Sequence, residues 1–302
     1  MLVTLRSLSE VVVYSYGFLI LIGSISNTLA FIVFSRKRFK NTVFSIYFRF
    51  MIICDTFSLI LPLNKLLEIN YQIYLANHSE FSCKFRYYFI YAIVPVSGWT
   101  MVFISLDRLF SISMPMKFLF RKNICFQILV CLSVLMFNLI YFLPNLNSSI
   151  KERRFTNKET NETILYRYCD IRNSSLMWMN LFQQDLGPFL LMIIFTTMTL
   201  RSLFNSRKRS NIKNDLSRKK DVKFAITSVV LNVIYLALNT PFCAYRIIYE
   251  YVKNRIDPNL DSFLIAITFL FNYTNHITIF FINLSVNSLF RQELISLFKR
   301  KN

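Results

Sequence analysis

The chain has 302 residues, of which 54% are hydrophobic and 17% aromatic, and it contains only four glycines. A composition this apolar excludes an ordinary soluble globular protein. The net charge of +19 is compatible with nucleic-acid binding, but a nucleic-acid-binding domain does not separate its basic residues by largely uncharged blocks of about twenty residues. The basic residues are therefore expected in the loops of a membrane protein, and no nucleic-acid partner is expected.

Seven apolar blocks follow one another along the chain, each close to the length of about 20 residues that a helix needs to cross a bilayer. They cover residues 11–34, 43–64, 86–106, 124–146, 178–204, 222–249 and 261–286. These blocks predict an all-α membrane protein, a single domain over residues 1–302 built as a seven-transmembrane helix bundle. Residues 287–301 mix apolar and charged positions, which predicts a short amphipathic eighth helix in contact with the lipids of the inner leaflet.

The loops between the blocks differ in composition, and this difference predicts the orientation of the chain. Basic residues gather at 36–40, at 207–223 and at 299–301, and the positive-inside tendency places these segments in the cytoplasm. The glycosylation acceptors of the loops fall on the opposite side, at Asn77, Asn147, Asn161 and Asn173. Both patterns predict a plasma-membrane protein with its amino terminus outside and its carboxyl terminus in the cytoplasm.

Charged and cysteine positions around the third block have a specific spacing. Cys83 precedes the block, Arg108 of the pair Asp107-Arg108 follows 25 positions later, and Pro115 stands seven positions further on. This spacing resembles the third helix of rhodopsin-like (class A) G-protein-coupled receptors, whose pair is followed by tyrosine where this chain has Leu109. The simpler alternative is that Arg108 only fixes a helix end at the membrane interface.

The resemblance extends over nearly the whole chain and is to peptide receptors of this family, although the chain is divergent. It implies a receptor, not an enzyme, that binds an extracellular ligand and activates a heterotrimeric G protein. It also implies a disulfide between Cys83 and Cys169 that ties the second outer loop to the third helix. Asp221, twenty positions before Pro241, matches an acid that holds the helix-three arginine in the resting state. The alternative for Asp221 is a solvated charge in a basic loop.

Asp55 is a carboxylate in the middle of an apolar block, and such a charge is costly enough to mark a functional site. In the family, the corresponding acid helps to hold a sodium ion together with a polar residue of helix three and asparagines of helix seven. Ser97 and Asn275 match two of those partners, whereas Ile279 stands in place of the second asparagine. A sodium ion acting as an allosteric modulator is the one cofactor that the resemblance implies.

The expected ligand is a peptide, for example a neuropeptide, rather than a biogenic amine. Amine receptors carry an aspartate eighteen positions before the helix-three arginine, and this chain has Ile90 there. Several polar residues are placed to face an outer cavity, as a convergent set would be: Arg86, Tyr91, Gln184, Arg246 and Glu250. Arg246 suits a carboxylate or an amidated peptide end. The loop from Asn145 to Trp178 is long enough to form a hairpin over the cavity.

Two motifs depart from the family pattern and leave alternatives open. The tryptophan of the sixth-helix motif is replaced by Asn239, and the seventh-helix Asn-Pro-x-x-Tyr is replaced by the residues from Ile279 to Asn283. One alternative is a receptor-like protein with impaired G-protein coupling. The other is a seven-span channel or transporter subunit, which would be expected to carry several ionisable residues at mid-membrane, whereas Asp55 is the one clear case.

Overall fold

The computed structural model describes residues 2–40, 42–61, 79–113, 123–147, 149–156, 163–170, 174–209, 216–252 and 256–299. The α-helices are α1 (Leu2–Phe34), α2 (Lys37–Lys40), α3 (Val43–Ile60), α5 (Glu80–Ser113), α6 (Ile124–Tyr141), α7 (Ser174–Leu181), α8 (Gly187–Arg209), α9 (Leu216–Val252), α10 (Pro258–Thr274), α11 (Thr278–Val286) and α12 (Ser288–Phe298). Two strands, β1 (Ser149–Thr156) and β2 (Thr163–Asp170), form a hairpin. The helical turns are η3 (Leu143–Asn147), η4 (Phe182–Leu186) and η5 (Asn275–Ile277).

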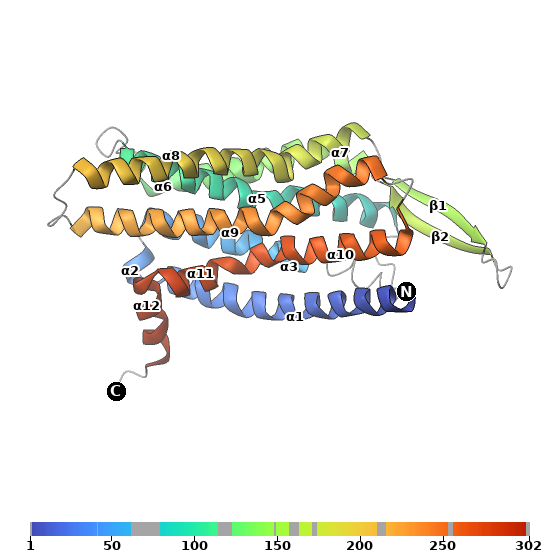
Figure 1. Cartoon of the computed structure of the whole chain (residues 1–302), viewed down its shortest axis with the longest axis horizontal. Coiled ribbons are helices and arrows are strands. Elements are labelled where there is room, and N and C mark those ends of the chain that lie inside the picture. Colours follow the sequence, from blue (N-terminus) through green and yellow to red (C-terminus); the bar gives the residue numbers. More distant parts are fainter. Residues whose placement is uncertain are drawn as a thin grey trace.

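The long helices run side by side as one bundle (Figure 1). The start of α1 and the β1–β2 hairpin lie at one end of this bundle, and α2 and α12 lie at the other (Figure 1). The helix α5 occupies the centre, because it packs against α3, α6, α8 and α9. Accordingly 61% of the most apolar stretch of α5 is buried, against 22% of that of the span Ile124–Asn147, which includes α6. Large apolar side chains of α6, such as Leu129 and Ile140, are exposed on the outer surface, as expected for a helix that faces lipid.

Within the described residues, six helical segments are long and apolar enough to cross a membrane. They are Tyr14–Phe34, Glu80–Ser113, Ile124–Asn147, Trp178–Asn205, Phe224–Tyr249 and Phe263–Val286, and each overlaps one predicted block. The block at 43–64 corresponds to α3, which has 18 residues and is not among these six. Residues 62–64 lie outside the described part of the chain, so the crossing at 43–64 stays a prediction.

The regular helical hydrogen bonding is interrupted at points where polar residues gather. A π-helical turn, η4, lies between α7 and α8, and the N–H of Gly187 reaches back to the carbonyl of Phe182. The indole N–H of Trp99 donates to the carbonyl of Gln183 at 2.9 Å. A 3-10 turn, η5, likewise separates α10 from α11. Short π and 3-10 segments inside long helices often mark functional positions, because they redirect side chains and free backbone groups.

The predicted hairpin is confirmed in the loop between α6 and α7. Strands β1 and β2 are antiparallel, with Ile150 paired to Cys169 and Thr156 paired to Thr163. The hairpin projects from the end of the bundle at which α1 begins (Figure 1). Strand β1 also packs against α5, so the hairpin is in contact with the central helix.

The helix α12 turns away from the axis of the bundle directly after α11 (Figure 1). Asn287 caps it, because its side-chain oxygen accepts a hydrogen bond from the N–H of Phe290. Phe290 is fully buried against Phe34, and Glu293 forms ion pairs with Arg36 at 2.9 Å and Arg38 at 3.1 Å. These contacts join α12 to the segment after α1. Within the predicted segment 287–301, residues Ser288–Phe298 are helical, and an amphipathic eighth helix at the inner leaflet stays a prediction.

Candidate functional site

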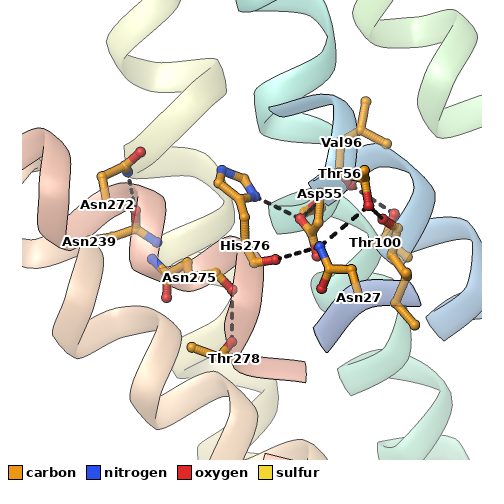
Figure 2. Close-up of polar contacts among 12 residues, drawn as sticks. Asn27, Asp55, Thr56, Val96, Thr100, Asn239, Asn272, Asn275, His276 and Thr278 are labelled. Atoms are coloured by element: carbon orange, nitrogen blue, oxygen red, sulfur yellow. Dashed lines mark hydrogen bonds and ion pairs between the residues drawn. The ribbon is translucent and has the colours of Figure 1, made fainter. Parts of the chain in front are cut away.

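Three polar side chains from distant parts of the sequence meet inside the bundle, and we call Asp55, Ser97 and His276 the central cluster. Figure 2 shows Asp55 and His276 facing each other. They come from α3, α5 and η5 respectively, and all three are buried. The hydroxyl of Ser97 donates to Oδ1 of Asp55, and Nδ1 of His276 lies 2.7 Å from the same oxygen. An ionised carboxylate only accepts hydrogen bonds, so Nδ1 carries the hydrogen when Asp55 is charged. The buried carboxylate thus has partners on two other elements.

A hydrogen bond from α1 holds the backbone of η5 in place. Nδ2 of Asn27 donates to the carbonyl oxygen of His276 at 3.0 Å and approaches the hydroxyl of Thr56 at 3.4 Å (Figure 2). Asn27 therefore positions His276 for its contact with Asp55.

Asn275, the third predicted member of the sodium site, does not join Asp55 and Ser97. Its side chain is buried, and neither its amide oxygen nor its amide nitrogen has a hydrogen-bond partner. Figure 2 shows this amide on the side of Asn239, away from Asp55. Ile279, which stands in place of the family's second asparagine, is buried among apolar side chains. The next residue, His276, contacts the carboxylate instead.

The sequence interpretation assigned no role to His276. A signal for it existed, since the chain has only two histidines and this one lies inside an apolar block. An ionisable side chain at such a position needs a partner within the bundle. The identity of that partner depends on the fold, because His276 and Asp55 are 221 positions apart.

A second polar contact joins α9 to the neighbouring α10 at the altered sixth-helix motif. Nδ2 of Asn272 on α10 donates to Oδ1 of Asn239 on α9, and Nδ2 of Asn239 donates to the carbonyl of Tyr235 at 3.1 Å (Figure 2). Pro241 lies inside α9, two residues further on. The position where the family carries tryptophan is therefore occupied by an amide that joins α9 to α10.

Another asparagine of α9, also absent from the predicted site, links three spans. Nδ2 of Asn232 donates to the hydroxyl of Ser105 on α5 at 2.7 Å and to that of Thr196 on α8 at 2.8 Å. All three residues are buried. Such hydrogen bonds between helices stabilise the association of helices within a membrane.

The predicted ligand residues Arg246 and Gln184 meet towards the end of the bundle that carries the hairpin (Figure 1), which is the predicted outer end, and we call Gln184, Asp185 and Arg246 the outer cluster. Nη1 of Arg246 lies 2.6 Å from Oδ2 of Asp185 and 3.1 Å from Oε1 of Gln184. Its guanidinium also lies 5.5 Å from the ring centroid of Phe242. The Asp185 side chain is only 3% exposed and that of Arg246 13%. The π-turn η4, which carries both acceptors, is thereby tied to α9.

The other predicted ligand residues lie in the same outer region or outside the described side chains. The ring of Tyr91 on α5 stacks 6.1 Å from that of Phe142. Arg86, one helical turn towards the start of α5, lies with its guanidinium 6.0 Å from the ring of Tyr87. Glu250 belongs to α9, and its side chain is not among those described.

The acid–arginine pair lies at the opposite end of α5. Asp107 and Arg108 are both buried, and Nη2 of Arg108 donates to Oδ2 of Asp107. Asp221 lies in α9, but its side chain is outside the described set, so its proposed pairing with Arg108 stays a prediction.

Cys83 is buried and disulfide-bonded. Cys54, Cys125, Cys131 and Cys243 carry free thiols. The predicted partner, Cys169, lies on β2 with its side chain outside the described set, so this pairing stays a prediction.

Among the predicted glycosylation sites, Asn147 is exposed at the end of η3. Asn77, Asn161 and Asn173 lie outside the described residues.

Comparison with known proteins identifies relatives of the chain. A family model described as "7 transmembrane receptor (rhodopsin family)" matches residues 26–278. A purinoceptor of Rattus norvegicus is 23% identical to the chain over 266 residues, a match that covers 84% of this chain and 75% of the rat protein. The family match includes the central cluster, the outer cluster and the Asp107–Arg108 pair.

Proposed function

Because the chain belongs to the rhodopsin family of seven-transmembrane receptors, we propose that it binds an extracellular ligand and activates a heterotrimeric G protein. The chain is a multi-pass membrane receptor and not an enzyme. Membership of a receptor family also argues against a channel or transporter subunit. The proposal includes α3 as the remaining crossing, and it places the β1–β2 hairpin outside the cell and α2 and α12 in the cytoplasm.

The observation that carries the proposed ligand site is the buried ion pair of the outer cluster. Arg246 belongs to α9, the helix that contains Pro241, whereas Asp185 belongs to a different span. A ligand anion that replaced Asp185 as the partner of Arg246 would break this tie between η4 and α9. Ligand binding would then shift the equilibrium between two arrangements of the bundle. The size of this shift is set by the difference in the ligand's affinity for the two arrangements.

The proposed ligand is a peptide, whose terminal or side-chain carboxylate pairs with Arg246. Ile90, which lies on α5 one residue before Tyr91, provides no carboxylate for an amine. The similarity to a purinoceptor favours a second candidate, a purine nucleotide, because a phosphate would pair with the same guanidinium. Both ligands present an anion to Arg246, so their common feature is negative charge.

At the cytoplasmic end, Arg108 is proposed to contact the G protein once α9 has moved outward. Asp107 already binds it in this structure, and the proposed pairing with Asp221 would add a restraint from α9. The basic segments 36–40 and 207–223 would attract anionic lipid and acidic surfaces of the G protein.

A ligand screen in cells that carry the chain and a promiscuous G-protein reporter tests the proposed activity. The panel contains peptides with free and with amidated carboxyl termini, nucleoside diphosphates and triphosphates, and amines. A response to an anionic ligand that Arg246→Ala abolishes, and that Lys84→Ala at the exposed outer end of α5 leaves intact, supports the proposal. A response to amines that is unaffected by Arg246→Ala contradicts it.

G-protein coupling is tested separately by measuring basal and ligand-stimulated recruitment of G proteins. Asp221→Ala is expected to raise basal recruitment at equal surface expression, because it removes the proposed restraint on Arg108. Specific ligand binding without recruitment of any G protein would support the alternative of a receptor with impaired coupling.

The orientation is tested by epitope tags and by glycosidase treatment. An amino-terminal tag accessible on intact cells and a carboxyl-terminal tag accessible only after permeabilisation are the expected results. A carboxyl-terminal tag exposed outside the cell would refute the proposed topology. Loss of apparent mass on treatment with an N-glycosidase, reduced by Asn147→Gln, would place η3 on the outer side.

A further inference from the structure

The pocket around Asp55 is the place where the family resemblance implies a sodium ion, and the residues present do not fit one. We propose that the imidazole of His276 takes the place of this cation, so that the receptor is insensitive to sodium. This inference goes beyond ligand binding and G-protein activation and does not depend on them. It follows from three features of the central cluster.

The first feature is that the carboxylate oxygen is already occupied. Oδ1 of Asp55 accepts the hydroxyl hydrogen of Ser97 and has Nδ1 of His276 2.7 Å away. This separation is a normal hydrogen-bond length, and it leaves no space for an ion between the ring and the oxygen. Figure 2 shows the imidazole pointing from η5 directly towards Asp55.

The second feature is that the oxygen ligands expected from the last span are missing at Asp55. Hard cations are held by several oxygen atoms from carboxylates, carbonyls, amides or water. When Asp55 is charged, the ring nitrogen that faces it donates a hydrogen, and a nitrogen that donates a hydrogen has no lone pair for a metal ion. The amide of Asn275 is on the side of Asn239, and Ile279 supplies only hydrocarbon.

The third feature is that His276 is held in this position from several sides. Its carbonyl accepts the hydrogen bond from Asn27, and its ring lies 5.8 Å from that of Tyr273. Its side chain is only 6% exposed. Because protein interiors are densely packed, a buried ring of this size does not swing aside without displacing its neighbours.

The consequence concerns how α3 and α5 are joined to the last span. A sodium ion would form an exchangeable link whose occupancy depends on the sodium concentration. The His276 side chain is covalently part of η5, so the link to Asp55 is always available and needs no ion. The resting arrangement of this receptor is therefore expected to be independent of sodium.

The test is thermal unfolding of the purified full-length receptor in sodium chloride, potassium chloride and choline chloride at equal ionic strength and constant pH. The unaltered receptor is expected to unfold at the same temperature in all three salts. In His276→Ser the ring is removed and a hydroxyl oxygen is added beside Asp55 and Ser97. This variant is expected to gain a stabilisation of a few degrees that is specific to sodium.

Two further variants make the assignment specific. Asp55→Asn added to His276→Ser is expected to abolish the sodium response, because it removes the anionic ligand. Asn275→Ala is a matched control on the same turn, which removes a buried polar side chain but leaves the contact between His276 and Asp55. This control is expected to stay insensitive to sodium.

Stabilisation of the unaltered receptor by sodium overturns the proposal, and so does a folded His276→Ser that gains no sodium response. If His276→Ser does not fold, His276→Asn, which also supplies an oxygen, is measured in its place under the same criteria. If neither variant folds, thermal unfolding of the unaltered receptor in the three salts decides alone. A sodium-specific rise in its unfolding temperature refutes the proposal, and equal unfolding temperatures support it. None of these measurements uses ligand or G protein. Failure of the sodium proposal can therefore be distinguished from failure of the proposed receptor function.

Discussion

The central cluster and the outer cluster each hold a buried carboxylate against a basic side chain, but they differ in how that side chain is held. In the central cluster a short histidine side chain is fixed on a turn that α1 also binds, and Asp55 has a further partner on α5. In the outer cluster a long arginine side chain extends from α9 to two acceptors on η4. The central contact thus joins elements through short, enclosed side chains, whereas the outer contact depends on one flexible side chain at the end of the bundle.

This difference separates a structural role from a binding role. A ligand can compete for Arg246 because the guanidinium has several donors and reaches its acceptors from the outer end. No comparable access exists at Asp55, whose partners come from elements packed around it. We therefore expect substitutions in the outer cluster to affect ligand response as well as stability, and substitutions in the central cluster to affect stability without a direct effect on ligand binding.

The largest effect is expected from breaking the outer pair on one side only. Asp185→Ala leaves Arg246 nearly buried without its charge partner, which should lower the free energy of unfolding by about 3–5 kcal/mol. The double variant Asp185→Leu/Arg246→Met should recover most of this loss, because an apolar pair of similar size is tolerated where one buried charge is not. Thermal unfolding in detergent measures both effects. A double variant as unstable as the sum of its single variants would show that the two side chains do not act as a pair.

A smaller effect is expected from the close approach between the two clusters, where α5, α8 and α9 meet at Gly98. A Cβ atom placed there would clash with the hydroxyl oxygen of Tyr235 and would lie 3.5 Å from Cβ of Pro188. Gly98→Ala should therefore destabilise by about 1–3 kcal/mol through overpacking.

Two variants give the control and the rescue for Gly98→Ala. Tyr235→Phe removes the clashing oxygen and leaves the ring carbon 3.3 Å away, so it should restore part of the stability. Gly17→Ala, at a helix position with nothing within 4 Å, should be neutral or stabilise by up to about 1 kcal/mol. If Gly98→Ala behaved like Gly17→Ala in thermal unfolding, the close approach would be absent.

Asp55→Asn is expected to have a moderate effect, because the amide keeps an oxygen that accepts hydrogen bonds from Ser97 and His276. Replacing bonds to a charged acceptor by bonds to a neutral one should lower stability by about 1–2 kcal/mol. Asp55→Leu, which removes both bonds, should cost more. Equal loss in the two variants would mean that the charge, and not the hydrogen bonding, holds the central cluster together.

The smallest effect is expected at the exposed pair of Lys84 and Glu80, whose charged atoms lie 3.4 Å apart one turn from each other on α5. Lys84→Ala should change stability by about 0.5 kcal/mol or less, since an exposed pair on a helix surface contributes little. A loss as large as that of Asp185→Ala would show that burial does not distinguish the outer cluster from a surface pair.

The family membership and most of the membrane helices could be predicted from local features of the sequence. Apolar blocks, basic loops and the spacing from Cys83 to Arg108 are properties of short stretches or fixed intervals, and the match to the rhodopsin family confirms the resemblance drawn from them. Asp55 was found because a charged side chain is rare and costly in an apolar block, whereas Ser97, Gln184 and Arg246 were found through the positions that the family resemblance implies. The hairpin between α6 and α7 was expected from loop length alone.

The sequence by itself determined which segments are apolar enough to enter a membrane and where a buried charge would need a partner. Only the tertiary structure decided which partner it found. Asp55 meets His276 rather than Asn275 because the 3-10 turn η5 directs these adjacent side chains to opposite sides, and Arg246 meets Asp185 because the π-turn η4 presents its polar residues to α9. Helix periodicity relates residues three or four positions apart. It carries no information about contacts between residues 61 or 221 positions apart, which depend on how the helices pack.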